Sequence, residues 1–211
     1  MLYCEKLTSI KYERNSEINR ARRFQCNIVY DLRDHSRGFG RRGKLQLKQS
    51  TLQSNEEQAA AACKAYAEAQ EIFHRTDWDG DGILEYTPKL SELWETQSGT
   101  GNVGLLDAEF VAADATLPNP KPYKGYLFKP LHSRIVNNKT ISYITQAGNQ
   151  TLGYAFIAYP AQYKLTGVMT FTISSTGTIY QEDLGPDTPA VVAQTTTFSK
   201  ASEIPWVMQP E

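Results

Sequence analysis

The hydrophobic and polar positions between residues 55 and 75, NEEQAAAACKAYAEAQEIFHR, follow a helical period. Small and apolar side chains recur every three or four positions, whereas most charged side chains fall outside that stripe. The stretch is rich in Ala, Glu and Gln and contains neither Gly nor Pro, so its intrinsic propensity also favours helix. Asn55 is a good N-cap, and Gln58 follows at the capping-box spacing. We therefore predict a helix over residues 55–75 whose narrow face of small residues packs against a sheet.

From residue 123 the pattern changes to short runs rich in β-branched and aromatic residues, separated by turn residues. Strands that are neighbours in sequence and joined by short links usually pair with one another. We predict an antiparallel sheet over residues 123–184 and short helices over residues 89–114. The fold class is then α+β, with one long N-terminal helix packed on an antiparallel β-meander of four to five strands. The runs are YKGYLFKPL, TISYITQAG, TLGYAFIAYPA, GVMTFTISS and GTIYQEDLG.

Charge divides the chain into two unlike segments, although the formal net charge is only −1. Residues 1–54 hold 12 Lys and Arg against 5 Asp and Glu, whereas residues 55–211 hold 10 against 18. We therefore predict a basic, poorly ordered arm over residues 1–54 and an α+β domain over residues 55–211. A basic arm suits nucleic acid or an anionic membrane. Aromatic residues are sparse there and no known nucleic-acid module is present, so we expect no nucleic-acid partner.

The acidic loop at residues 76–88 has the only convincing ligand-binding spacing in the chain. Calcium takes six to eight hard oxygen ligands, and alternate carboxylates on a tightly turning backbone can all point inward. Gly82 falls where a calcium loop makes its sharp turn. The predicted ligands are the carboxylates of Asp77, Asp79, Asp81 and Glu85, with the backbone carbonyl of Ile83.

The loop departs from a complete EF-hand at its twelfth position. A bidentate Glu is expected there, and this chain has Pro88. The calcium hypothesis therefore needs a modified site, completed by Glu92, Glu95 or a distant carbonyl, with an affinity of roughly 0.1–1 mM. The alternative is a solvated acidic turn, because Asp-Gly pairs are common turn formers. Both interpretations stay open at this point.

The C-terminal half carries the sequence YPAQY, then GVMTF, then YQEDLGPDT. This order resembles a bacterial family of secreted proteins of unknown function with the signature YPAxY…GVMTF…YxxDLGPDT. DWDGDGILEY and KPYKGYLFKPL also occur in that family's order, so the resemblance spans residues 55–207. The helix-then-meander order is similar, more loosely, to the soluble domains of type IV pilin-like and pseudopilin proteins, although no apolar stem precedes Asn55.

The resemblance implies an extracellular, periplasmic or cell-envelope protein without catalysis. We predict a non-catalytic extracytoplasmic structural or interaction module, pilin-like and stabilised by Ca2+, with a protein partner or self-assembly. No apolar stretch is long enough to span a membrane, and no signal peptide is visible. No catalytic or cofactor-binding residue and no small-molecule ligand is assigned.

Two other functions are weighed against this prediction. One is a ligand-binding protein that uses a Tyr-rich sheet face, and it predicts an exposed aromatic cleft. The other is a hydrolase that uses Asp183 or Asp187, because paired carboxylates can perform acid–base chemistry. It predicts that these carboxylates converge with another polar group in a pocket. The tyrosines of the predicted face are Tyr154, Tyr159, Tyr163 and Tyr180.

Overall fold

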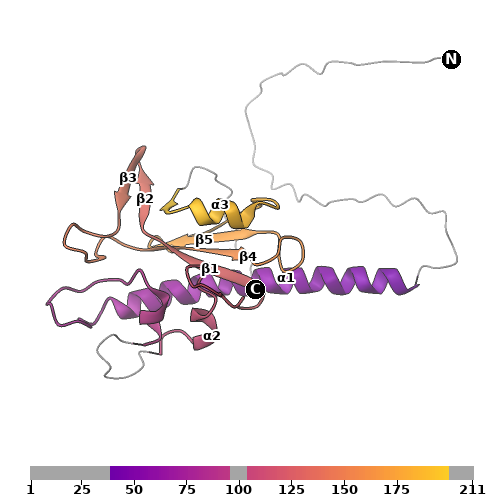
Figure 1. Ribbon diagram of the computed structural model, residues 1–211, viewed down its shortest axis with the longest axis horizontal. Helices are drawn as coiled ribbons and strands as arrows, with labels where there is room; N and C mark the ends of the chain where they lie inside the picture. Colours follow the sequence, from indigo (N-terminus) through magenta and orange to yellow (C-terminus); the bar gives the residue numbers. More distant parts are fainter. Residues whose placement is uncertain (1–38, 96–103, 200–211) are drawn as a thin grey trace, which may run out of the picture. The chain divides into compact units, whose positions relative to one another are not determined.

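The computed structural model describes residues 39–95 and 104–199, with side chains from residue 46 onward. All of them belong to one compact unit that begins at Phe39. The fold is α+β, as predicted (Figure 1). The helices are α1 (Phe39–Phe73), η1 (Leu90–Leu93, a 3-10 helix), α2 (Ala108–Val111) and α3 (Thr188–Gln194). The strands are β1 (Tyr126–Leu131), β2 (Ser133–Val136), β3 (Lys139–Ser142), β4 (Ala155–Pro160), β5 (Thr170–Ser174), β6 (Ile179–Glu182) and β7 (Thr197–Phe198).

The strands form two sheets where one meander was predicted. The larger sheet is antiparallel, with the order β1-β4-β5-β6. The run TISYITQAG does not join it, because β3 pairs with β2 in a hairpin that leaves the large sheet between β1 and β4. Asn137 and Asn138 have φ of 50° and 59°, which suits the tight turn of a two-residue hairpin. β7 extends this small sheet by pairing with β2 in parallel.

Helix α1 begins at Phe39, so the prediction of a start at Asn55 is wrong. Residues 44–54 lack Gly and Pro and contain Lys, Gln and Leu, which favour helix. The predicted arm therefore loses residues 39–54 to α1, and residues 1–38 lie outside the described part of the chain. At its other end α1 stops at Phe73, two residues before the predicted end at residue 75.

Asn55 and Glu56 attach α1 to the β4–β5 connection instead of capping the helix. The Asn55 amide donates to the carbonyl oxygen of Thr166 over 2.8 Å. Glu56 Oε1 accepts the backbone amides of Val168 at 2.8 Å and Met169 at 3.2 Å. Asn55 and Glu56 have the sequence pattern of a helix start. They lie inside α1 instead and form three tertiary hydrogen bonds to the β4–β5 connection.

The main core lies between α1 and one face of the large sheet. Tyr66 is buried, and its ring stacks on that of Phe156 of β4 with centroids 4.1 Å apart. Phe171 of β5 points to the same side. Buried alanines on α1, such as Ala59 and Ala62, let the helix approach the sheet closely. The predicted face of small residues is thus the face that packs.

Residues of α3 and β7 pack on the other face of the large sheet, and Figure 1 shows α3 on the side of the strands opposite α1. Ile157 and Tyr159 of β4 alternate with the residues that face α1, and they pack with Val192 of α3 and Phe198 of β7. Lys129 of β1 donates through Nζ to the carbonyl oxygens of Val192 and Ala193, each over 2.8 Å. These bonds supply a charged donor to carbonyls in the last turn of α3, where intrahelical partners run out.

Gln70 joins α1 to the last residues of the acidic loop. It is fully buried, and its Nε2 donates to the Thr87 carbonyl over 2.6 Å and to the Tyr66 hydroxyl over 2.8 Å. Its Oε1 accepts the Thr87 amide at 3.1 Å. Both backbone groups of Thr87 therefore depend on one side chain of α1.

We expect Gln70→Ala to lower the free energy of unfolding by about 2–4 kcal/mol, because it leaves buried backbone groups unpaired and opens a cavity. Urea denaturation measures the loss. The matched control is Gln53→Ala in the same helix, where an exposed amide bonds only Glu57 and the cost should stay below about 0.5 kcal/mol. Equal losses in the two variants would contradict the assigned role of Gln70.

Candidate metal site

An aromatic contact holds the start of the acidic loop against the end of α1. Trp78 donates its indole N–H to the Phe73 carbonyl over 2.9 Å, and the two rings stack with centroids 5.4 Å apart. The chain then turns twice, at Gly80 with φ of 81° and at Gly82 with φ of 84°. Only glycine adopts this left-handed region without strain. Gly82 therefore has the conformation that the calcium-loop pattern assigns to it.

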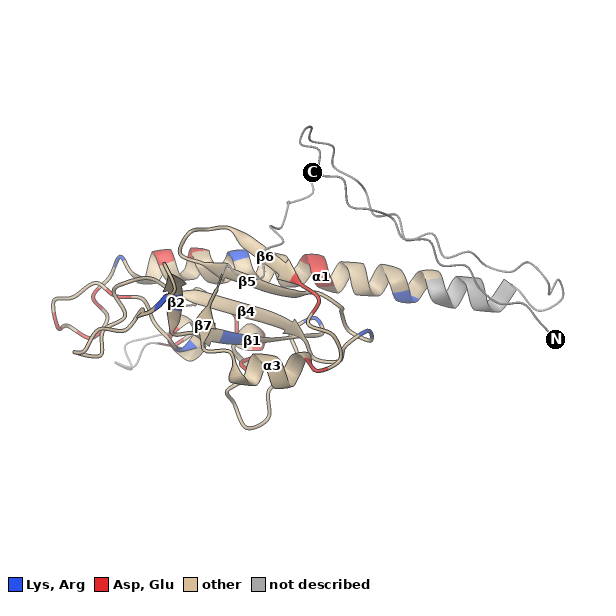
Figure 2. Ribbon diagram, turned by 90° about the horizontal axis from the view of Figure 1, so that it is seen from above, with Lys and Arg blue, Asp and Glu red and all other residues tan. Residues whose placement is uncertain are grey.

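The two turns bring the carboxylates of Asp77, Asp79 and Asp81 together. One oxygen from each lies within 4.8 Å of the others, so one cation could touch all three. Figure 2 colours the acidic residues of this loop red, at the left end of the view. These three oxygens are the part of the predicted ligand set that the structure assembles.

Backbone amides already orient all three carboxylates, and Asp79 Oδ1 accepts the Asp81 amide at 3.2 Å. Asp77 accepts from the amides of Gly80 at 2.7 Å and Gly82 at 2.9 Å, and Asp81 accepts from Ile83 at 2.7 Å. The bonds from Gly82 and Gly80 lower the pKa of Asp77. The loop thus keeps this carboxylate in the charged form that a cation requires.

Glu85, the predicted fourth carboxylate, turns away from the three aspartates. Its Oε2 accepts the Gln150 amide at 3.1 Å, next to a short antiparallel bridge between Tyr86 and Gln150. Burial raises the pKa of Glu85, and the nearby charges of Asp79 and Asp81 add to that effect. Glu85 therefore ties the loop to residues 145–150.

The two glutamates offered as replacements for the twelfth position bond outside the cluster. Ile83, the predicted carbonyl ligand, is exposed and contacts the cluster through its amide, which donates to Asp81. Glu92 accepts from the Thr87 hydroxyl and forms an ion pair with Lys89 at 2.8 Å. Glu95 accepts the indole N–H of Trp94 at 3.1 Å. Neither glutamate replaces the missing ligand of the twelfth position.

Asn149 is the one contact to the cluster that sequence reasoning missed. Its Nδ2 donates to Asp81 Oδ2 over 2.8 Å across a separation of 68 residues. No local spacing could have revealed it, because the contact depends on how residues 145–150 fold back onto the loop. If its side-chain amide rotated to present the oxygen, Asn149 could supply a further ligand to an ion at the cluster.

The carboxylates of the hydrolase hypothesis belong to a turn between β6 and α3. Asp183 accepts from the Gly185 amide at 2.9 Å and from the Tyr163 hydroxyl at 3.1 Å. The Thr188 hydroxyl donates to the Gly185 carbonyl over 2.6 Å. Asp187 precedes α3 and makes no side-chain capping bond. Both aspartates are exposed, so the DLGPDT motif acts through backbone bonding within the turn.

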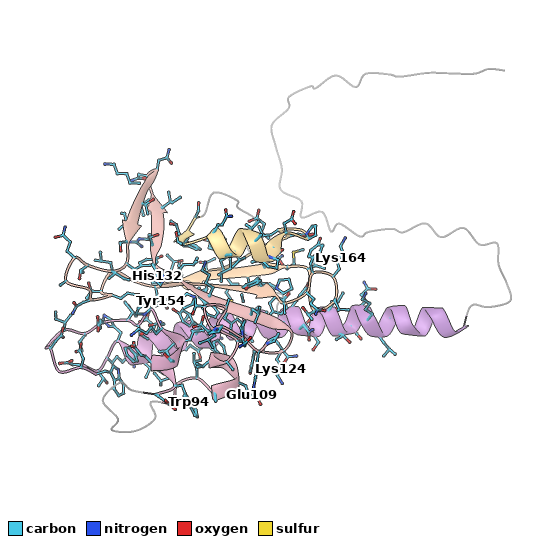
Figure 3. The ribbon with its side chains drawn as sticks, in the orientation of Figure 1. Trp94, Glu109, Lys124, His132, Tyr154 and Lys164 are labelled. Atoms are coloured by element: carbon cyan, nitrogen blue, oxygen red, sulfur yellow. The ribbon has the colours of Figure 1, made fainter. Side chains whose placement is uncertain are left out.

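The four tyrosines of the predicted aromatic face point in different directions. Tyr154 is buried on the α1 side, where its hydroxyl lies 3.4 Å from the Ala67 carbonyl (Figure 3). Tyr159 and Tyr180 belong to the opposite face, and Tyr163 lies in the β4–β5 connection. These tyrosines therefore do not line one exposed cleft.

The family model described as "Protein of unknown function (DUF2950)" matches residues 38–206. The chain belongs to this family, and its helix α1 coincides with the start of the match. No curated protein and no solved structure matches the chain. Within the described residues, no helix is both long enough and apolar enough to cross a membrane.

Calcium binding at the three aspartates would raise thermal stability. At about ten times its Kd, an ion that binds only the native state adds about 1.4 kcal/mol. We expect Asp79→Ala and Asp81→Ala to abolish the rise in Tm between EDTA and millimolar calcium. Glu109→Ala, an exposed acid on α2 (Figure 3), should keep it. Differential scanning calorimetry measures the shift. Two results would contradict calcium binding: no shift in Tm for the native sequence, or the same shift in both loop variants as in the native sequence. Either result would leave the loop as a solvated acidic turn.

Proposed function

We propose that this protein is a non-catalytic structural or interaction module of the cell envelope or the extracellular space, built like the soluble part of pilin-like proteins. The supporting features are the helix-then-sheet order and the family signature. One observation carries the proposal further than the sequence did. Helix α1 continues well before Asn55 as an exposed stem, defined here as residues 46–54 (Figure 1).

The side chains of the stem make few contacts with the domain. All are exposed except Leu52, which is half-buried, and Leu47 is 69% exposed. Ser50 and Thr51 bond only to the Leu47 carbonyl within the same helix. A polar helix without tertiary packing is marginal in water. A helical stem of this kind gains stability when a second surface covers it.

Charge favours a second copy of the chain as that surface. The helical residues before Asn55 include Arg41, Arg42, Lys44 and Lys48 and no acidic residue, whereas residues 55–211 hold 18 Asp and Glu against 10 Lys and Arg. The basic first part of α1, which includes Lys48 of the stem, and an acidic domain attract each other at moderate ionic strength. We therefore assign the stem to self-assembly, in which the stem of one copy contacts the domain of the next.

Calcium has a stabilising part in this proposal. The aspartate cluster lies at the end of α1 that is opposite the stem, and Gln70 and Glu85 tie its loop to the domain. An ion at Asp77, Asp79 and Asp81 would fix the loop without touching the stem. Calcium binding and assembly are therefore separable in experiments.

Sedimentation velocity of the full chain tests the assembly. We expect concentration-dependent oligomers that dissociate as salt is raised from about 0.05 to 0.5 M, because screening weakens exposed charge contacts. Lys48→Glu should shift the chain to monomer, whereas Lys164→Glu, an exposed lysine of the β4–β5 connection (Figure 3), should not. A monomer at every concentration, or equal effects of both variants, would contradict the role of the stem.

Cell fractionation tests the location. We expect antibody against residues 55–211 to detect the protein in the envelope fraction or the medium of the cells that produce it. A cytoplasmic enzyme probed in the same fractions controls for lysis. Recovery of the protein together with that enzyme would refute the extracytoplasmic assignment.

A further inference from the structure

A cavity of about 230 Å³ lies on the face of the large sheet that α3 and β7 cover, away from α1. Strands β4, β5 and β6 form its floor, with Ile157, Thr170 and Tyr180 among the lining residues. Val191 of α3 and Phe198 of β7 line the other side. The cavity is separate from the aspartate cluster and from the stem, because neither contributes a lining residue.

The alternation of β5 explains why space remains there. Phe171 and Ile173 point toward α1 and fill the main core, so Thr170 and Thr172 point to the α3 side. Threonine is smaller than the aromatic residues that fill the other face. The short helix α3 covers this face without closing it.

Two cross-strand pairs place hydroxyl, carboxylate and aromatic groups along the cavity. Thr170 lies opposite Glu182, and Thr172 lies opposite Tyr180, so all four side chains share one face of β5 and β6. This places a hydroxyl beside a carboxylate, and a second hydroxyl beside an aromatic ring. The ring of Tyr180 is held by Phe198, with centroids 5.9 Å apart.

The unpaired Thr170 hydroxyl is the observation that most strongly indicates a ligand. Thr170 is 3% exposed, and its Oγ1 finds no hydrogen-bond partner in the part of the chain that the structure describes. Native proteins pair nearly all buried polar groups, because an unpaired one costs free energy. The neighbouring Glu182 carboxylate does not bond it either. A ligand hydroxyl in the cavity would pair this group.

The lining defines the ligand's charge and polarity. It contains no Lys, Arg or His, so nothing there compensates an anion. The hydroxyls of Thr170 and Thr172 and the Glu182 carboxylate suit the hydroxyl groups of a neutral ligand. The ring of Tyr180 and the side chain of Ile157 offer apolar contact to its C–H face. These features favour an uncharged ligand that is rich in hydroxyls and apolar on one side.

The volume limits the ligand to one ring. An engineered cavity of about 150 Å³ holds benzene, and drug-sized ligands occupy pockets of about 300–1,000 Å³. A cavity of about 230 Å³ lies between these values. It accommodates one six-membered ring with its substituents.

We propose that the cavity bounded by Thr170, Tyr180 and Glu182 binds one neutral pyranose ring, as a free monosaccharide or as the terminal unit of a glycan. Thr170 Oγ1 and the Glu182 carboxylate hydrogen-bond two ring hydroxyls, and Tyr180 packs against the ring. This site is independent of calcium and of assembly through the stem.

Titration of the full chain tests the site. The probes are glucose, galactose, mannose and N-acetylglucosamine, each as the free sugar and as a disaccharide with that sugar at its non-reducing end. Saturation-transfer NMR detects weak binding, and calorimetry gives the Kd. We expect at least one probe to bind. Tighter binding of its disaccharide would identify a glycan end as the ligand, and equal or weaker binding would identify the free sugar.

The decisive variant is Thr170→Val, which removes the unpaired hydroxyl and keeps the side-chain shape. We expect it to weaken binding about tenfold while Tm stays the same or rises, since the lost hydroxyl has no protein partner. Thr140→Val, at an exposed strand position of β3, controls for the substitution and should leave the Kd unchanged. If Thr170→Val does not fold, Glu182→Gln provides the same comparison.

Two results would overturn the proposal. One is that no probe binds the full chain at concentrations up to tens of millimolar. The other is that a probe binds with the same Kd to the native sequence, to Thr170→Val and to Glu182→Gln, which would place binding elsewhere. Neither result would bear on the stem, because sedimentation measures assembly without sugar.

Discussion

The packing of one face of α1 on β4 and β5 is the contact on which the rest of the structure depends. Tyr66 stacks on Phe156 in the middle of this contact, and the alanines around it bring the helix backbone close to the sheet. The two ends of the contact are fixed by polar side chains, Glu56 at one end and Gln70 at the other. Apolar burial supplies most of the stabilisation, and these polar bonds set where along the sheet the helix lies.

The sequence predicted what local periodicity controls. The helical period placed the packed face of α1, and the predicted runs placed β1, β3, β4, β5 and β6 but not β2 or β7. Such patterns follow from the geometry of each element alone. Asn55 shows where local patterns mislead, since the same side chain can cap a helix or donate to a distant carbonyl. The pairing of β2 with β7 and the Asn149 contact depended on long-range folding, which no spacing records. In the candidate metal site, the aspartate spacing predicted the cluster, whereas Glu85 bonds to Gln150.

The two faces of the large sheet have different compositions, and the difference follows from β5. Its residues alternate between phenylalanine or isoleucine and threonine, so one face receives large apolar side chains and the other receives small hydroxyl-bearing ones. The first face suits a permanent contact with α1, which needs no polar groups. The second face keeps polar atoms and free volume beneath α3. The alternation within this five-residue strand thus separates the apolar core on the α1 side from a sheet face that carries hydroxyl groups.

The bonds from Asn55 and Glu56 to the β4–β5 connection have a mechanical consequence. They lie at the point where α1 leaves the sheet and becomes the stem. A pull along the stem is therefore resisted first by three hydrogen bonds that are stretched together, before the buried aromatic contacts are strained. Bonds that share a force in this way fail together and at higher force than bonds that open one after another. Tension applied through the N-terminal helix would therefore load these three bonds before it reaches the core.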